Sequence, residues 1–236
     1  MTDGAGRGAG YAGGPPHREG STIRESAVTD RPPIVAPRSA PDATRLAVRI
    51  DDLAFFDGDA IARPVTAELG ATTPLGRRHE SAALEGERGA RLARQLAPNE
   101  PLAVGAAVVT GAGALDAELL VHAVVQSRDE RVSRDGVRRA TTSALQRAAD
   151  FRVAHLGVAP FGLGAGNLDP DGSAAAMAEP VLRHLARAPF PARVTIVVAS
   201  DDERRAFQAA LQAAFAAASE ATAASASPAR GGAGAT

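Results

Sequence analysis

The sequence predicts a three-layer α/β/α domain built on a mixed, largely parallel β-sheet. From Leu119 onward, short apolar runs alternate with amphipathic segments in the order strand, helix, strand, helix, strand, helix. Helices that connect continuously apolar strands are typical of parallel strands buried on both faces. The half of the domain before Leu119 contains more strand than helix, which predicts that the sheet is mixed rather than wholly parallel.

Each element is expected from its local pattern. Strands are expected over Leu46–Ile50, Ala60–Val65, Val104–Thr110, Leu119–Val125, His155–Phe161 and Val194–Ala199. Helices are expected over Ser81–Leu96, from an N-cap at Asp135, over about Ala174–Arg187, and after Ser200. Gly86 and Gly89 weaken the first helix, and Ser200 with Glu203 forms a capping box for the last. The second helix has an apolar face made of Val137, Ala140, Thr141, Ala144, Leu145 and Ala148.

The two ends of the chain differ in composition from its middle. Residues 1–43 are rich in Gly, Pro, Arg and Ser, and residues 219–236 are rich in Ala, Ser and Gly. Such segments bury too little apolar surface to offset the entropy of ordering. We therefore expect one domain over residues 44–218 with a disordered tail on each side.

Composition excludes several classes of function. The 236 residues include no cysteine, and all 26 basic residues are arginine. Schiff-base lysines, P-loop lysines, disulfides and thiolate ligands are therefore impossible. A net charge of −1 argues against duplex nucleic acid or an anionic membrane as partner. No metal, no cofactor and a cytoplasmic location are expected, since no histidine pair has metal-ligand spacing and no signal or spanning segment is seen.

A glycine-rich loop is the strongest candidate site. The segment Pro160–Asn167 follows an expected strand and has glycine at 162, 164 and 166. Alternate glycines allow consecutive backbone N–H groups to face one anion, and a helix N-terminus near Ser173 favours the same charge. From the residues alone, a loop that merely needs flexibility explains this pattern equally well. Its position between a buried strand and a helix favours phosphate binding.

Three segments of the chain follow one another in a recognisable order. They are Gly105–Leu115, with Thr-Gly-Ala-Gly-Ala-Leu at its end, Leu120–Val124 with its Val-His-Ala-Val strand, and the Pro-x-x-Gly-x-Gly of Pro160–Gly164. Together they resemble the macro domain family. Asp52 also lies seven residues before Asp59, the spacing of two acidic segments of that family. The resemblance covers about Arg45–Ala216 and implies a macro-like fold.

The resemblance also implies a ligand and the residues that hold it. Asp52 would accept a hydrogen bond from the adenine amino group, although the residues alone are explained more simply by a solvated turn. The diphosphate would be wrapped by Gly162, Leu163, Gly164, Ala165, Gly166 and Asn167. The first hypothesis is thus a module that binds ADP-ribose, a related NAD-derived nucleotide diphosphate, or an ADP-ribosylated protein.

Departures from the family pattern keep two alternatives open. Arg63-Pro64-Val65-Thr66 stands where hydrolytic macro domains have Asn-Ala-Ala-Asn, and Ala71–Gly76 replaces their first glycine-rich loop. No catalytic residue is predicted, and enzyme activity is not favoured. The alternatives are a divergent ADP-ribosyl hydrolase and a ligand-free macro-like interaction module. His122 and His155 are expected to be core histidines and Asp59 to be structural. His79-Glu80 could face the cleft, although the start of a surface helix is the simpler interpretation.

Overall fold

The protein is described by a computed structural model that covers residues 43–95, 100–164 and 167–226. The disorder expected for residues 1–42 and 227–236 lies outside these described residues, as do Ala165 and Gly166 of the predicted loop.

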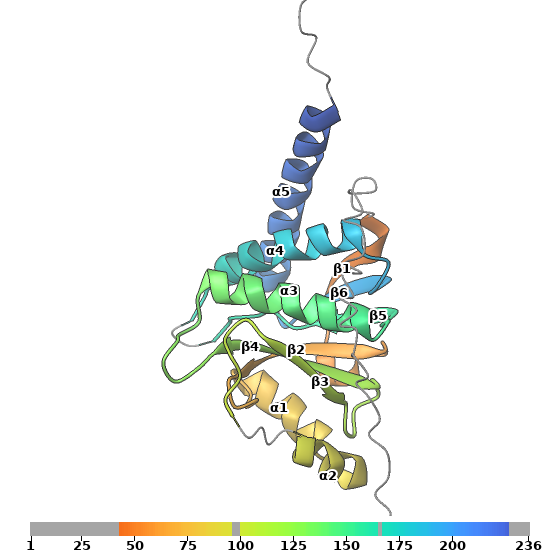
Figure 1. The fold of residues 1–236 in the computed structure, drawn as a ribbon, viewed down its shortest axis with the longest axis vertical. Helices are drawn as coiled ribbons and strands as arrows, with labels where there is room; N and C mark the ends of the chain where they lie inside the picture. The colour runs from red at the N-terminus through yellow and green to blue at the C-terminus, as the bar shows by residue number, and fades with distance from the viewer. Residues whose placement is uncertain (1–42, 96–99, 165–166, 227–236) are drawn as a thin grey trace, which may run out of the picture. The chain divides into compact units, whose positions relative to one another are not determined.

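One six-stranded sheet forms the centre of the domain (Figure 1). Its spatial order is β1 (Leu46–Ile50), β6 (Arg193–Val198), β5 (His155–Val158), β2 (Ala60–Thr66), β4 (Leu119–Gln126) and β3 (Ala107–Gly111). All neighbours are parallel except β3 and β4, which are antiparallel. The predicted mixed, largely parallel sheet is confirmed.

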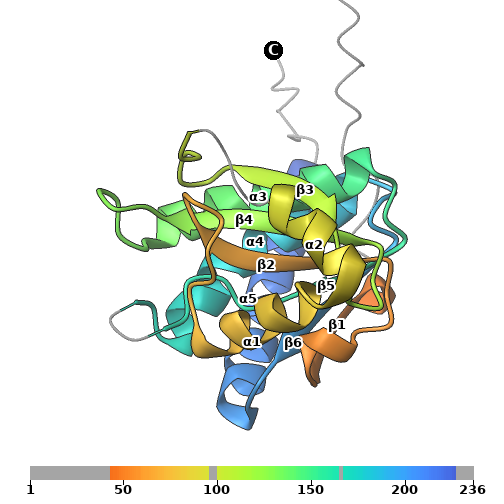
Figure 2. The same cartoon turned by 90° about the horizontal axis from the view of Figure 1, so that it is seen from below.

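Helices cover both faces of the sheet, which gives the predicted three layers (Figures 1 and 2). One face carries α3 (Arg134–Asp150), α4 (Pro170–Arg187) and α5 (Asp201–Ala226). The opposite face carries α1 (Pro74–Ala83) and α2 (Gly86–Gln95). Two short 3-10 helices, η1 (Ala43–Arg45) and η2 (Leu53–Phe55), flank β1.

The main hydrophobic core lies between the sheet and α3, α4 and α5. All six residues of the predicted α3 face are buried, from Val137 to Ala148. Phe161, Met177 and Phe207 are among the largest side chains added from neighbouring segments, and each is fully buried. Apolar burial of this extent is the dominant stabilising contribution to a fold.

The face that carries α1 and α2 is packed differently. One small apolar cluster includes Leu53, Ile61 and Leu120, and a second includes Val65 and Val124. Because side chains alternate along a strand, the residues between these clusters on β2 and β4 also point to this face. They are Arg63 and His122, which are partners in the strand register and are both buried.

The single helix expected over Ser81–Leu96 is wrong, because two helices occupy this region. The first begins at Pro74, well before the expected start, where Thr73 caps the helix and proline occupies its first turn. The second begins at Gly86, whose φ of +63° lies in the left-handed region that interrupts a continuous helix. Thr73-Pro74 is a recognisable start signal, but it lies outside the apolar pattern from which the helix was predicted.

Other element ends also differ from expectation. The N-cap of α3 is Ser133, whose hydroxyl accepts from the Gly136 N–H, while the predicted cap, Asp135, lies in the first turn. Asp169 caps α4 in the same way and moves its start to Pro170. β5 ends at Val158 rather than Phe161. Short capping side chains decide helix ends more locally than apolar periodicity does.

The last helix extends beyond the expected domain end at residue 218. Glu203 and Ser200 form the expected capping interactions, with Ala199 N–H donating to Glu203 and Glu203 N–H donating to Ser200. From this start, α5 continues to Ala226 because alanine has the highest helix propensity. None of the helices within the described residues is long and apolar enough to cross a membrane.

Candidate ligand-binding cleft

A cleft opens where two central strands part. β5 pairs with β2 only along Ala60–Ala62, whereas β2 continues to Thr66 alongside β4. Beyond this point the chain leaves the sheet at Ala159 and forms the glycine-rich loop. The resulting cleft, about 340 Å³, lies at the carboxyl ends of the parallel strands, where open α/β sheets bind ligands. It is lined by Asp51, Leu53, Arg63, Pro64, Thr73, Pro74, Leu75, Gly76, His79, Ala159, Pro160, Leu163, Gly164, Val197, Ala199 and Glu203.

Pro64 marks the point at which the two strands separate. Proline is rare in central strands because it cannot donate to the ladder. Here the Ala62 carbonyl accepts from Ala159 N–H on the β5 side, at 3.0 Å. Pro64, two residues later, faces the same side after β5 has ended, so no ladder bond is lost and its ring lines the cleft.

Part of the predicted glycine loop lines this cleft. Leu163 and Gly164 are lining residues, and Gly164 has a φ of +139°. Asn167 N–H donates to the Gly164 carbonyl at 3.0 Å. Ala165 and Gly166 lie outside the described residues.

Gly162 has a packing role beneath the loop. Its φ is +84°, and a Cβ at this position would lie 2.7 Å from Val137 Cγ2 and 3.2 Å from Leu168 Cδ1. Its carbonyl accepts from Leu168 N–H at 3.0 Å. Gly162 therefore lets the loop lie close against α3, while Gly164 is the glycine at the cleft surface.

The opposite wall is the first turn of α1. Pro74 has no N–H group, and Gly76 N–H donates to the Thr73 hydroxyl at 2.9 Å. Leu75 supplies the remaining N–H group of positions 74–76. This wall thus offers fewer backbone donors than a glycine-rich loop would, as expected from its sequence.

Asp52 does not line the cleft but lies at its margin. Its Oδ1 accepts from Ala54 N–H at 2.9 Å and lies 2.8 Å from Nε2 of the buried His79. The backbone hydrogen bond from Ala54 is the main reason that the pKa of Asp52 is lowered. Its neighbour Asp51 lines the cleft directly. His79, expected to start a surface helix, instead packs inward from α1.

The two ends of the cleft differ in charge. Asp51 and Glu203 follow β1 and β6 and place carboxylates at one end. Arg63 on β2 is the one arginine among the lining residues of the described chain. A ligand with a hydrogen-bond donor at one end and an anionic group at the other matches this polarity.

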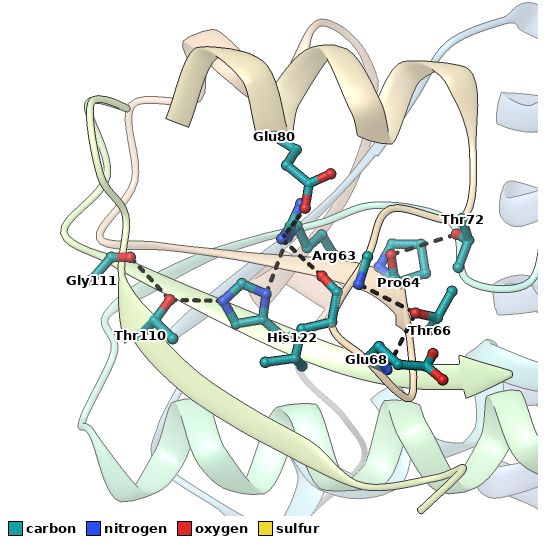
Figure 3. Close-up of polar contacts among 11 residues, drawn as sticks. Arg63, Pro64, Thr66, Glu68, Thr72, Glu80, Thr110, Gly111 and His122 are labelled. Carbon is teal, nitrogen blue, oxygen red and sulfur yellow. Dashed lines mark hydrogen bonds and ion pairs between the residues drawn. The ribbon is translucent and has the colours of Figure 1, made fainter. Parts of the chain in front are cut away.

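Arg63 is held by a buried hydrogen-bond network (Figure 3). Its Nε donates to His122 Nδ1 at 3.1 Å, and its Nη2 donates to Glu80 Oε1 at 3.2 Å. His122 Nε2 lies 2.7 Å from the Thr110 hydroxyl oxygen, which itself donates to the Gly111 carbonyl. The Arg63 side chain is 4% exposed, whereas Glu80 is 24% exposed.

This network fixes the protonation state of His122. An Nδ1 that accepts from Arg63 carries no proton, so Nε2 is the protonated atom and donates to Thr110. Burial, with a smaller effect from the Arg63 charge, lowers the pKa of His122 to about 3. His122 is therefore a neutral core histidine, as the sequence predicted, but it also positions a cleft residue.

Arg63 is the cleft residue that sequence reasoning missed. From the sequence it marks only the absence of an asparagine, because its partners lie 59 residues away at His122 and 17 residues away at Glu80. A charged residue in an otherwise apolar strand was the available signal.

Two other residues singled out from the sequence lie at the opposite end of the strands. Asp59 is structural, as expected: its Oδ2 accepts from the N–H groups of Ala154 and His155, each at 2.8 Å. His155 is only partly buried, and its Nε2 lies 2.9 Å from the Thr195 hydroxyl oxygen. Neither Asp59 nor His155 lines the cleft.

A larger hollow lies elsewhere, between β1, α4 and α5. Its volume is about 610 Å³, and it is lined by Leu46, Val48, Leu182, Gln208, Leu211, Gln212, Phe215 and Ala216. Its lining has no charged residue and no glycine loop, so no group there is suited to bind phosphate. No cluster of three or more His, Asp or Glu side chains that would hold a metal occurs in the described part of the chain.

The fold and cleft define an α/β domain whose candidate site lies between a glycine loop and a helix N-terminus at the carboxyl ends of parallel strands. Residues 81–177 match the family model described as "Macro domain". Together with the fold, this match shows that the chain is similar to macro domain proteins. The resemblance predicted from sequence is confirmed.

Solved macrodomain structures share this fold. The Oceanobacillus iheyensis macrodomain with ADP is 14% identical, with a TM-score of 0.62, and the match covers 72% of this chain and 91% of that one. The Trypanosoma brucei macrodomain in complex with ADP-ribose is 15% identical, also with a TM-score of 0.62, over 74% of this chain and 72% of that one. At these identities the similarity establishes the fold alone.

Two sequence relatives come from mycobacteria. Uncharacterized proteins of Mycobacterium bovis and Mycobacterium tuberculosis are each 29% identical over 199 residues, which is 83% of this chain. The match covers 52% of each relative. The chain therefore spans about half the length of the curated relatives that it matches.

Proposed function

We propose that this domain is a binding module for ADP-ribose or a related NAD-derived nucleotide diphosphate. The observation that carries the proposal is the glycine loop at the cleft. Leu163 and Gly164 border a 340 Å³ space at the carboxyl ends of the parallel strands, opposite the first turn of α1. Backbone N–H groups of such a loop bind a diphosphate without lysine.

The rest of the cleft suits the remainder of such a ligand. Leu53, Val197 and Ala199 are apolar residues that line the cleft near the acidic end, and an adenine ring would pack against them. A carboxylate at this end accepts a hydrogen bond from the adenine amino group. Asp51 lines the cleft, and Asp52 lies beside it with one oxygen bonded to Ala54 and His79.

Binding is favoured over hydrolysis by the residues at the other end. Arg63 is a donor held in place by His122 and Glu80, and it is not a general base. Pro64 presents a ring to the cleft where an amide would otherwise orient a ribose. The partner is accordingly a free nucleotide or an ADP-ribosylated protein that the module recognises without cleaving it.

Isothermal titration of the full chain with ADP-ribose tests this function. We expect micromolar binding that is lost in Gly164→Glu, because the new carboxylate fills the loop and repels the diphosphate. The matched control is Gly86→Glu. Gly86 also has a positive φ, of +63°, but a Cβ there meets nothing within 4 Å and the residue lies outside the cleft.

Unchanged binding in Gly86→Glu with loss in Gly164→Glu assigns the ligand to this cleft. Absence of heat and of thermal shift at millimolar ADP-ribose would leave the ligand-free interaction module as the better account. Release of ADP-ribose from a modified protein would instead revive the hydrolase.

A further inference from the structure

The guanidinium of Arg63 has a hydrogen-bonding position that the protein leaves unused. Nε and Nη2 are paired with His122, Glu80 and the Leu69 carbonyl, the last at 3.5 Å. Nη1 is buried and is the single buried side-chain nitrogen or oxygen without a hydrogen-bond partner in the described residues. A buried charged donor without an acceptor is costly in free energy, so a group that supplies an acceptor there is strongly favoured.

A water enclosed in the protein interior is a poor partner for this donor. Apart from the cleft, Arg63 borders a cavity of about 10 Å³, at the lower limit for a single water. The other residues around that cavity are apolar, except for His79, and a buried water needs roughly two to four polar partners. The larger cleft that Arg63 also borders has room for a ligand oxygen.

The charges along the cleft indicate which kind of ligand oxygen would pair with Arg63. The opposite end holds the carboxylates of Glu203 and of Asp51, the latter paired with Arg49. Arg63 is therefore the better partner for an anionic group. Glu80 offsets part of the Arg63 charge, but it is the more exposed member of the pair and is therefore the more strongly screened by solvent. Arginine binds phosphate oxygens more strongly than it binds neutral hydroxyls.

We propose that Arg63 is a specificity-determining residue that makes the cleft favour nucleotides carrying a terminal phosphate beyond the diphosphate over those ending in a neutral sugar. This inference rests on the proposed function, since it assumes that the glycine loop holds a nucleotide diphosphate. It ranks the ligands of that class: Arg63 receives an anionic group past the diphosphate, whereas a neutral ribose there leaves Nη1 poorly paired.

Titration of the full chain with three probes tests the proposal: ADP, ADP-ribose and ATP, all without divalent cations. ADP has nothing beyond its diphosphate, ADP-ribose adds a neutral sugar and ATP adds a phosphate. We expect ATP to bind roughly tenfold more tightly than ADP-ribose. In Arg63→Gln this preference disappears, because affinity falls more for ATP than for ADP when charge-assisted bonds to the terminal group are removed.

Glu80→Gln provides a test that keeps the guanidinium in place. The amide oxygen still accepts from Nη2, but the neutralising charge is gone, so ATP binding strengthens severalfold and ADP binding changes little. Circular dichroism and thermal melts establish that each variant is folded. Where Arg63→Gln is unfolded, the change in ATP preference in Glu80→Gln decides the proposal.

The outcomes separate this inference from the function on which it rests. If none of the three nucleotides binds, the proposed function itself is wrong. If ADP and ADP-ribose bind but ATP binds no more tightly than ADP-ribose, the inference is overturned and the binding function stands. An ATP preference that survives in folded Arg63→Gln, or that does not rise in Glu80→Gln, also overturns it.

Discussion

The two faces of the central sheet are packed on different principles. Against α3, α4 and α5 the sheet buries one continuous apolar cluster. Against α1 and α2 it buries two small clusters, separated by Arg63 and His122. A buried ion pair is a weak source of stability, because desolvation offsets most of the attraction between the charges. The comparison indicates that the first face contributes most of the stability of the fold, whereas the second borders the candidate cleft.

The strongest test of this comparison is a cavity in the apolar face. Phe207 of α5 is fully buried against the sheet and does not line the cleft. Phe207→Ala is expected to reduce the free energy of unfolding by about 3–5 kcal/mol, from lost burial and the remaining cavity. Urea denaturation measures this loss. Ligand affinity of the folded variant should stay unchanged, and a large loss of affinity would contradict the division between the faces.

Lowering the pH should reduce the free energy of unfolding through His122, which is buried on the α1 side of the sheet. Its pKa is lowered to about 3 in the folded protein against an ordinary value of 6.5, so between these values the unfolded chain binds the extra proton. Stability is therefore fully present above pH 6.5 and falls as pH decreases toward 3. The slope from this group approaches about 1.4 kcal/mol per pH unit.

His122→Asn removes this titration and keeps an acceptor for Arg63. The pH dependence of urea unfolding should be shallower in the variant than in the original chain over the same range. The lowered pKa values of Asp52, His155 and His184 add slope of the same sign in both proteins, so the difference isolates His122. Equal slopes would mean that folding does not lower the pKa of His122.

Removal of the buried Arg63 guanidinium tests how much the polar network on the α1 side of the sheet contributes to stability. Arg63→Met leaves His122 Nδ1 without a donor and Glu80 without its ion-pair partner, so we expect a loss of about 2 kcal/mol. Adding Glu80→Leu and His122→Leu should recover most of this loss, because apolar side chains of similar volume then replace all three members of the buried polar network. Thermal denaturation measures the stability of both variants. A triple variant that stays as unstable as Arg63→Met would show that the hydrogen-bond network of Arg63, Glu80 and His122 itself stabilises the fold.

The smallest expected effect comes from a helix cap on the apolar face. The Ser133 hydroxyl accepts from Gly136 N–H at 3.0 Å at the start of α3. Ser133→Ala should cost about 1 kcal/mol of stability. Nucleotide titration should show no change in affinity. The cleft-side counterpart, Thr73→Ala, should cost a similar amount of stability but also alter affinity, since it frees the Gly76 N–H beside the cleft.

Much of the fold was predictable because apolar periodicity reports directly on burial. The expected β1 range, Leu46–Ile50, is confirmed to the residue, and every inward residue expected on α3 is buried. The starts of α1 and α4 were missed because Thr73-Pro74 and Asp169-Pro170 set them through local capping. These signals carry no apolar periodicity, although they are visible in the sequence.

The candidate site was less predictable because it depends on tertiary pairing. The glycine loop was proposed as a site from the sequence, and in the structure Leu163 and Gly164 line the cleft while Gly162 serves packing. The role of Arg63 follows from register with His122 and from the inward turn of α1 that brings Glu80 over it. Neither contact leaves a local pattern in the sequence.

Hydrogen exchange with and without ADP-ribose tests most directly whether the α1 side of the sheet is the binding face. We predict that bound ligand slows exchange in peptides containing Thr72–Gly76 and Leu163–Leu168, which flank the cleft. Peptides from β1 and the middle of α5, which border the larger apolar hollow, should exchange at the same rate in both states. Protection at that hollow, with none at the two cleft segments, would contradict the account.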